Sequence, residues 1–334
     1  RVAKAIGAQV HGREGRVAKA DVFFANALDH ARDLFAAGTP IVGVCASGIL
    51  IRGVAPLLGD KTSEPPVVSV SDDGAVVVPL LGGHRGANRI AREISAALGA
   101  TAAVTTAGDV SLGVSLDEPP FGWRLANPED AKAAMAGLLA GGGATISGDA
   151  AADATWLADL PKGDGLRISC TTADVKGGPG HLVFHPQLFA LGVGCARNAD
   201  PAELAELVSQ TLADAGIAAG AIHSVSSLDL KGDEPAMNQL AAQLGVPFRV
   251  FDAATLEAET PRLANPSNVV FAEVGCHGVS EGAALAQAGP DATLRVEKRK
   301  TANATCAVAE LAQPLTEMRG RSRGRLSIVG IGPG

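Results

Sequence analysis

Residues 79–88 (PLLGGHRGAN) connect an expected apolar strand, residues 75–81, to an amphipathic helix. A strand that enters a glycine-rich turn before a helix leaves backbone N–H groups exposed at the turn, with the positive helix end behind them. This arrangement favours an anionic ligand, and His84 and Arg85 would meet it first. His84 titrates in the range of a general base or acid. A tight connection that needs positive φ explains the glycines equally well.

A second group of charged residues, DLKGDEP (229–235), follows an expected strand at 222–226. Ligands of α/β sheets usually bind at the carboxyl ends of strands. We interpret Asp233 as the N-cap of the next helix. Capping explains neither Asp229 nor Lys231, so these two residues are candidates for binding or catalysis.

Two further motifs lie downstream. His277 stands in the turn GCHG (275–278), where a surface histidine at a helix start is the simpler interpretation. Residues 298–303 (KRKTAN) carry three consecutive bases between two expected hairpin strands, which is typical of a solvated edge strand. The same bases could also bind carboxylates. His181 and His185 have no third ligand nearby in the sequence, so we expect no metal site.

The hydrophobic pattern alternates strands with helices, which predicts an α/β fold. We expect two α/β layer domains with largely parallel sheets, separated by a small α+β middle domain. The expected helices are 26–37, 47–58, a helix after the glycine turn, 128–140, 200–215, 234–244 and 279–288; the expected strands are 41–46, 67–70, 75–81, 101–107, 144–147, two around 177–180, 188–194, 222–226, 248–251, 269–274 and a hairpin at 292–309.

Composition excludes several classes of protein. The chain has 334 residues, and its hydrophobic content of 47% excludes disorder. A formal net charge of −7 and an aromatic content of 3% argue against nucleic-acid binding. The longest nearly apolar run, 40–51, is too short to cross a bilayer. Five widely spaced cysteines without a CxxC motif indicate reduced thiols, and we therefore expect a cytoplasmic protein.

Several stretches resemble the CbiG family of cobalamin biosynthesis. Its N-terminal domain is similar to GILIR (48–52), APLLGDK (55–61), PLLGGHxGAN (79–88) and TTAxDV (105–110). Its C-terminal domain, which stands alone in some organisms as CobE, is similar to LGVGCAR (191–197), DLKxDEP (229–235), GxxGVxE (275–281) and KxKxxN (298–303).

The resemblance implies a domain organisation. We expect a CbiG N-terminal-like domain at 1–111, a middle domain at 112–187 and a CobE-like domain at 188–312. An Arg-rich linker and the first strand of a truncated tetrapyrrole methylase domain would occupy 313–334. The closing GRLSIVGIGPG (324–334) resembles the first strand and loop of such methylases. The chain would then be part of a fusion with a precorrin-3B C17-methyltransferase (CobJ-like) that uses S-adenosylmethionine.

The activity implied by the family is that of a cobalt-precorrin-5A hydrolase, which opens the ring A δ-lactone of a tetrapyrrole and releases acetaldehyde. Cobalt would be part of the substrate, and we expect no cofactor for this region. The reaction needs a base, oxyanion donors and cations for the substrate carboxylates. The catalytic candidates are His84, Asp229, Glu234 and Asp109; the substrate-binding candidates are Gly48, Arg52, Lys61, Gly82, Gly83, Arg85, Lys231, His277, Lys298, Lys300 and Asn303.

One alternative stays open at this point. In organisms that use the oxygen-dependent route, the ring-contraction fragment leaves as acetate, so hydrolysis would be redundant there. The region would then be a non-catalytic module that binds a corrin precursor and passes it to the fused methyltransferase. The expected partners are thus the tetrapyrrole substrate and the fused domain, without nucleic acid or membrane, and a homo-oligomer is left open.

Overall fold

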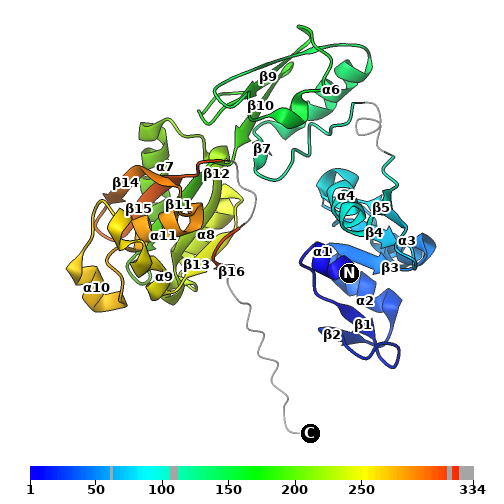
Figure 1. Ribbon diagram of the computed structural model, residues 1–334, viewed down its shortest axis with the longest axis horizontal. Coiled ribbons are helices and arrows are strands. Elements are labelled where there is room, and N and C mark those ends of the chain that lie inside the picture. Colours follow the sequence, from blue (N-terminus) through cyan, green and yellow to red (C-terminus); the bar gives the residue numbers. More distant parts are fainter. Residues whose placement is uncertain (61–62, 106–111, 314–317, 323–334) are drawn as a thin grey trace. The chain divides into compact units, whose positions relative to one another are not determined.

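The computed structural model describes residues 1–60, 63–105, 112–313 and 318–322, and only the backbone of His84 and Ser322 (Figure 1). The chain forms two compact units, Arg1–Glu118 and Pro119–Gly334. Both units contain sheets covered by helices, which confirms the expected α/β class. The domain limits that the resemblance implies are not tested by this division and stay a prediction.

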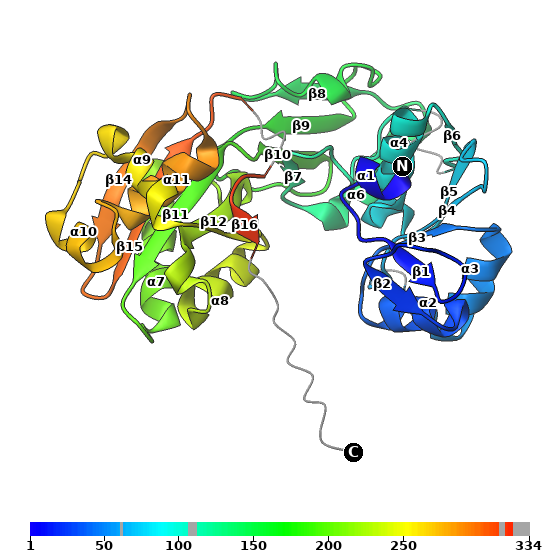
Figure 2. The ribbon, with the colours of Figure 1, turned by 60° about the horizontal axis from the view of Figure 1, so that its bottom comes forward.

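The N-terminal unit is built on a four-stranded sheet with the order β3-β4-β5-β6 (Figure 2). Strands β3 and β4 are parallel, β4 and β5 form the expected hairpin, and β5 and β6 are parallel. A separate parallel pair, β1-β2, lies near the N-terminus. The elements are α1 (Val2–Ala5), β1 (His11–Arg13), β2 (Val22–Phe24), α2 (Ala27–Ala36), β3 (Ile41–Val44), α3 (Ser47–Val54), β4 (Val67–Val70), β5 (Val76–Leu81), α4 (Ala87–Leu98) and β6 (Thr101–Ala102).

Two helical layers cover this sheet. On one face, Phe35 of α2 and Leu50 of α3 pack against Val67. On the other face, Ile94 of α4 packs against Val68. Neighbouring residues of β4 therefore belong to different cores, as the alternation of side chains along a strand requires. The sheet thus lies between α2 and α3 on one face and α4 on the other. Packing of these helices positions the turns at both ends of the sheet.

The second unit begins with a small sheet of order β7-β10-β9-β8. Strands β8, β9 and β10 are parallel, and β7 is antiparallel to β10. Arg124 of β7 donates to the carbonyls of Leu244 and Gly245, at 2.8 and 2.6 Å, and so joins this part to the C-terminal sheet. The elements are β7 (Trp123–Leu125), α6 (Pro128–Leu139), β8 (Ala144–Ser147), β9 (Leu166–Cys170) and β10 (His181–Pro186).

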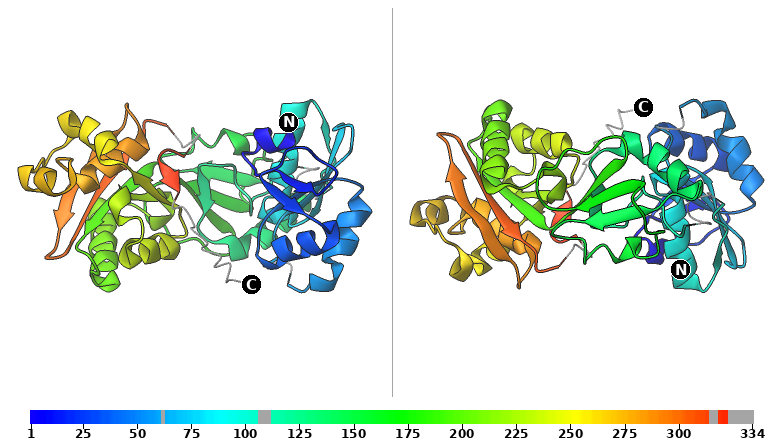
Figure 3. Two further views of the ribbon diagram at one scale, coloured as in Figure 1. Left: turned by 90° about the horizontal axis from the view of Figure 1, so that it is seen from below. Right: turned by 90° about the horizontal axis from the view of Figure 1, so that it is seen from above.

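The C-terminal sheet has six strands in the order β14-β15-β11-β12-β13-β16. Its central strands β11, β12 and β13 are parallel neighbours. Both views of Figure 3 show the long orange hairpin of β14 and β15 beside the green part of this sheet. The elements are β11 (Phe189–Cys195), α7 (Pro201–Ala215), β12 (Ile222–Leu228), α8 (Pro235–Leu244), β13 (Phe248–Phe251), α9 (Ala253–Ala258), α10 (Asn268–Val274), α11 (Val279–Ala288), β14 (Thr293–Lys300), β15 (Ala304–Glu310) and β16 (Arg321–Ser322).

Helices cover both faces of the C-terminal sheet. Leu204 of α7 and Met237 of α8 share a core with Leu191 of β11. On the opposite face α11 lies unusually close to β11, because a Cβ on Gly192 would stand only 1.9 Å from the carbonyl oxygen of Ser280. Glycine at this position thus sets the position of α11 on the sheet.

Several expectations from the sequence are wrong. The expected strand 101–107 ends at Ala102 within the described residues. Residues 269–274 form the helix α10 rather than a strand, because Ser267 caps its start and Gly275, at φ +78°, ends it. Asp233 is not the N-cap of α8; that position belongs to Glu234. Within the segment expected to be a linker, Arg321 and Ser322 form a strand that pairs antiparallel with β13. The residues beyond 322 lie outside the described part.

No helix in the described ranges is long and apolar enough to cross a membrane.

Candidate functional site

The carboxyl ends of β11, β12 and β13 lie together because these strands are parallel neighbours. The loop after β11 carries Arg197, and the loop after β12 carries Asp229 and Lys231. The turn between β14 and β15 reaches the same edge, since the N–H of Ala196 donates to the carbonyl of Asn303 at 2.9 Å. We call this region, residues 195–198, 229–234 and 300–303, the carboxyl edge.

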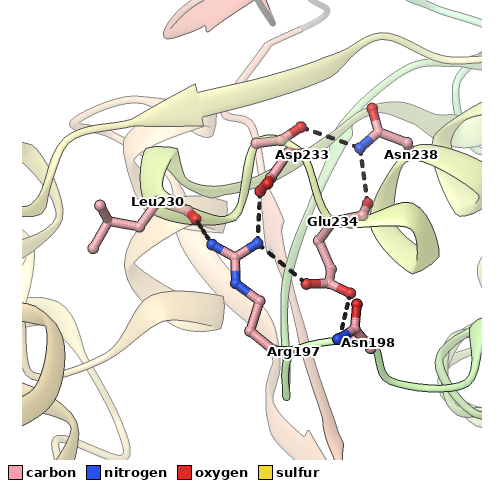
Figure 4. A network of polar contacts seen from close by, with 7 residues as sticks. Arg197, Asn198, Leu230, Asp233, Glu234 and Asn238 are labelled. Atoms are coloured by element: carbon pink, nitrogen blue, oxygen red, sulfur yellow. Dashed lines mark hydrogen bonds and ion pairs between the residues drawn. The ribbon is translucent and has the colours of Figure 1, made fainter.

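Glu234 connects two of these loops (Figure 4). Its side chain is 1% exposed. One carboxylate oxygen accepts the N–H of Asn198 at 2.9 Å, and the other lies 3.5 Å from a guanidinium nitrogen of Arg197. Asn198 has φ +55°, a left-handed conformation that asparagine tolerates better than most residues. Glu234 thus stabilises a strained turn and holds the neighbouring arginine.

Arg197 has two further acceptors at the carboxyl edge (Figure 4). One nitrogen donates to the carbonyl of Leu230 at 2.6 Å, and the other to Asp233, also at 2.6 Å. The hydrogen bond that Arg197 donates to the Asp233 carboxylate is the main cause that raises the pKa of Arg197. The side chains of Arg197 and Asp233 are 52% and 68% exposed, so this ion pair faces solvent.

Cys195 is half-buried at the end of β11, near Glu234, Lys231 and Arg197. Burial is the main cause that raises the pKa of this thiol, and Glu234 raises it further, while Lys231 and Arg197 oppose the shift. A thiol with a raised pKa stays protonated at neutral pH, so Cys195 is poorly suited to act as a thiolate nucleophile.

Asp229 is paired with Arg321, whose guanidinium lies 3.0 Å from its carboxylate. The Asp229 side chain is 34% exposed. Arg321 belongs to the segment that the sequence indicated as a linker, so the strand β16 brings an unexpected cation to the carboxyl edge.

The remaining C-terminal candidates surround this edge, but several are engaged locally. The side chain of Asn303 donates to Glu203 of α7 at 3.1 Å. Lys300 is exposed and pairs in register with Thr305, next to the end of β11. The ammonium of Lys298 donates to the carbonyl of Asn265 at 3.1 Å.

His277 lies just before α11 and contacts Glu257 and Phe271. Its Nδ1 is 3.0 Å from the Glu257 carboxylate, and its ring stacks on Phe271 with the ring centres 4.5 Å apart. The hydrogen bond from His277 is the main cause that lowers the pKa of Glu257. These contacts orient the imidazole towards α9 and α10.

Glu281, in the first turn of α11, is buried. Burial alone would raise its pKa, but hydrogen bonds from the backbone of Lys298 and from Asn265 outweigh it, so the pKa is lowered. This carboxylate therefore anchors β14 to α11.

The N-terminal candidates do not come together in the same way. Gly82, Gly83 and Arg85 follow β5, at the end of the sheet marked by the pair Val67 and Leu81. Gly48 and Arg52 belong to α3, which starts after β3 at the opposite end, marked by Val44 and Val70. The antiparallel step between β4 and β5 causes this separation. The Gly48 and Gly82 turns therefore cannot form one oxyanion site.

The glycine turn has the geometry that its sequence predicts. Gly82 and Gly86 have φ of +67° and +109°. A Cβ on Gly82 would also lie 3.1 Å from Cα of Pro66, so glycine is favoured twice at this position. His84 lies in the short helix Gly83–Arg85, but its side chain is outside the described part. Lys61 and Asp109 lie outside the described residues.

A cavity of about 750 Å³ in the N-terminal unit was not expected from the sequence. It lies between β1 and β3, and His11 and His30 line it, with their ring nitrogens 2.7 Å apart. Burial is the main cause that lowers the pKa of His11, and His30 lowers it further. Neither β1 nor β3 pairs with a described strand on its second edge. The cavity is therefore lined in part by two strand edges that have no partner among the described strands.

Within the described residues, no group of three or more His, Cys, Asp or Glu side chains could hold a metal ion.

Comparison with known proteins assigns the family. The family description "Cobalamin synthesis G N-terminal" matches residues 29–109, and "Cobalamin synthesis G C-terminus" matches residues 189–309. A curated relative from Salmonella typhimurium, named cobalt-precorrin-5A hydrolase, is 32% identical over 246 residues, which cover 68% of this chain and 70% of the relative. The chain belongs to the CbiG family of cobalamin biosynthesis.

Two more curated relatives match different shares of this chain. Protein CobE of Sinorhizobium sp is 50% identical over 129 residues, which cover 39% of this chain and 84% of the relative. The cobalt-precorrin-5A hydrolase of Priestia megaterium is 27% identical over 300 residues, or 83% of this chain and 79% of the relative. The resemblance of the motifs to CbiG and CobE is thus confirmed, whereas the fusion with a methyltransferase stays a prediction.

Proposed function

We propose that this chain hydrolyses the ring A δ-lactone of precorrin-5A or its cobalt complex and releases acetaldehyde. The similarity to two cobalt-precorrin-5A hydrolases carries this proposal, because the alignment to one of them covers 83% of the chain. The alignment to the second reaches 32% identity over 68% of the chain.

The chemistry asks for cations that bind the acidic side chains of the substrate. The carboxyl edge supplies Arg197 and Lys231, and Arg321 of β16 lies beside it, within a chain whose formal net charge is −7. A few basic side chains at defined positions, rather than the net charge of the whole chain, would bind the acidic substrate. Lys300 at the hairpin extends this group.

Hydrolysis also requires a base that takes a proton from water as it attacks the lactone carbonyl. We assign this role to His84, with Asp109 and Asp229 as the alternatives. Glu234 is better suited to positioning than to proton transfer, because its buried carboxylate already accepts from Asn198 and Arg197. The amides of Gly82 and Gly83 are our candidates for the oxyanion donors, with the amide of Gly48 as the alternative.

The remaining N-terminal cations, Arg52, Lys61 and Arg85, would bind substrate carboxylates on the N-terminal unit. Arg52 folds back on its own helix, and one guanidinium nitrogen lies 3.4 Å from the carbonyl of Gly48. A ligand that needs Arg52 must therefore draw it away from this weak contact.

We also propose that residues 324–334 begin a methyltransferase domain that uses S-adenosylmethionine. These residues lie outside the described part, so the proposal rests on the sequence GRLSIVGIGPG alone. The hydrolytic step does not depend on it.

The test is to incubate the full chain with precorrin-5A, with and without cobalt, and to measure acetaldehyde with an alcohol dehydrogenase assay. We expect enzyme-dependent release of acetaldehyde, and a loss of about 100-fold or more in His84→Ala. His181→Ala is the matched control, because this histidine contacts Ser169 and Arg167 in the middle sheet. Full turnover by His84→Ala would remove His84 from the mechanism.

A second function is favoured by one observation: the relative named CobE matches at 50% identity but covers only 39% of this chain. This relative therefore consists mostly of a region that corresponds to only part of our chain. Such a region could work as a separate module that binds a corrin precursor and passes it on. Such a module would bind precorrin-5A tightly and release it unchanged, without acetaldehyde.

A further inference from the structure

Arg197 is held in a fixed orientation at the carboxyl edge. Buried Glu234 and the carbonyl of Leu230 contact it from the protein side. These contacts come from the loop after β12, whereas Arg197 follows β11. The guanidinium is thus preorganised by a neighbouring loop before any ligand arrives, which reduces the entropy lost on binding.

The third acceptor of Arg197 is different in kind. Asp233 is 68% exposed, in contrast to Glu234 at 1%. An ion pair between exposed side chains contributes little free energy, because water solvates both partners well. The Asp233 carboxylate therefore contacts Arg197 from the solvent side and is readily exchanged for another carboxylate.

A second cation stands close to this point. Lys231 lies near enough to Cys195 to influence its pKa, as Arg197 does. Lys231 directly follows Leu230, whose carbonyl accepts from Arg197, so a ligand carboxylate that replaced Asp233 would meet Arg197 directly and the loop that carries Lys231 beside it. Planar guanidinium groups bind carboxylates with two parallel hydrogen bonds, which suits Arg197 for this role.

We propose that Arg197 binds a carboxylate side chain of an acidic corrin precursor, and that Asp233 occupies the same place on the guanidinium when no ligand is bound. The proposal rests on the proposed function for the class of ligand. Glu234 positions Arg197 throughout, and Asp233 is an internal competitor that lowers the affinity of the site.

The experiment measures binding rather than turnover. The full chain is titrated with cobyrinic acid, a corrinoid with many carboxylates, and with cobinamide, in which carboxamides replace them. We expect Asp233→Asn to bind cobyrinic acid at least threefold more tightly than the unmodified chain and to bind cobinamide with unchanged affinity. Arg197→Gln should bind cobyrinic acid at least tenfold more weakly.

Asp214→Asn is the matched control. It makes the same change of charge at an exposed position near the end of α7, on the helix that begins at the carboxyl edge. Its affinity for cobyrinic acid should stay within twofold of the unmodified chain, so a larger effect of Asp233→Asn would be local.

Two results would overturn the proposal. One is an affinity of Asp233→Asn for cobyrinic acid no higher than that of Asp214→Asn. The other is an equal gain for cobinamide, which carries no matching carboxylates. Asp233→Asn decides the question even if Arg197→Gln fails to fold. Absence of acetaldehyde release together with tighter binding by Asp233→Asn would reject the hydrolase and retain this binding site.

Discussion

The N-terminal and C-terminal sheets carry similar glycine turns but arrange them differently. In the C-terminal sheet, β11, β12 and β13 run in parallel, so the loops after them meet at one edge. In the N-terminal sheet, β4 and β5 are antiparallel, so the turns after β3 and β5 lie at opposite ends. Strand direction therefore decides whether such motifs can act together.

Glycine allows close helix packing at position 192 of the C-terminal sheet and a left-handed backbone at position 82 of the N-terminal sheet. Replacing these two glycines should give the largest changes in stability. Gly192→Ala places a methyl group against the backbone of α11, with the carbonyl oxygen of Ser280 only 1.9 Å away. We expect a loss of about 3 kcal/mol in the free energy of unfolding, because helix and sheet must separate. Gly82→Ala meets the cost of a left-handed backbone, about 1–2 kcal/mol, and a tight approach to the backbone of Pro66. Thermal and urea unfolding measure both.

Gly137→Ala is the control for these two variants. Gly137 lies within the helix α6 with open space around its Cα, so alanine should stabilise the protein by about 0.5–1 kcal/mol. If Gly192→Ala cost no more than Gly82→Ala, the close packing of α11 on β11 would be wrong.

We expect acid to destabilise the C-terminal sheet through protonation of His223. This side chain is 1% exposed in β12, and both ring nitrogens lack a hydrogen-bond partner among the described residues. Burial lowers the pKa of His223 from 6.5 to about 4. Since the folded state favours the neutral form, the associated stability is present above pH 6.5 and is lost as the pH falls towards 4. The full shift corresponds to about 3 kcal/mol, most of it realised only near pH 4.

His223→Gln tests this contribution, because glutamine cannot gain a charge. The unfolding free energy of this variant should fall less steeply between pH 6.5 and 4.5 than that of the unmodified chain. Equal slopes would show that His223 does not titrate in this range on folding.

The sequence predicted much of the C-terminal fold and part of the site. Strand 248–251 and helix 279–288 agree with β13 and α11 to the residue. The β-branched run at 269–274 was misinterpreted, because Ser267 and Gly275 at its ends decide for a helix. Asp229 and Lys231 were singled out by their place after a strand, and both lie at the carboxyl edge.

Arg197 was not among the predicted site residues, although it ends the motif LGVGCAR. Its partners, Leu230 and Glu234, are more than thirty residues away and come from the next strand's loop, a contact that only the sheet order creates. The separation of Gly48 from Gly82 could have been foreseen, because the predicted hairpin at 67–81 reverses the chain between them. Local patterns predict elements well, whereas the meeting of loops depends on strand order and direction.

Amide hydrogen exchange of the full chain, with and without cobyrinic acid, tests most directly whether the carboxyl edge is the ligand site. The account predicts slower exchange in residues 195–198 and 229–234 when the ligand is bound, because the ligand covers these loops and opposes the opening of their hydrogen bonds. Unchanged exchange in both segments, with protection elsewhere in the chain, would contradict it.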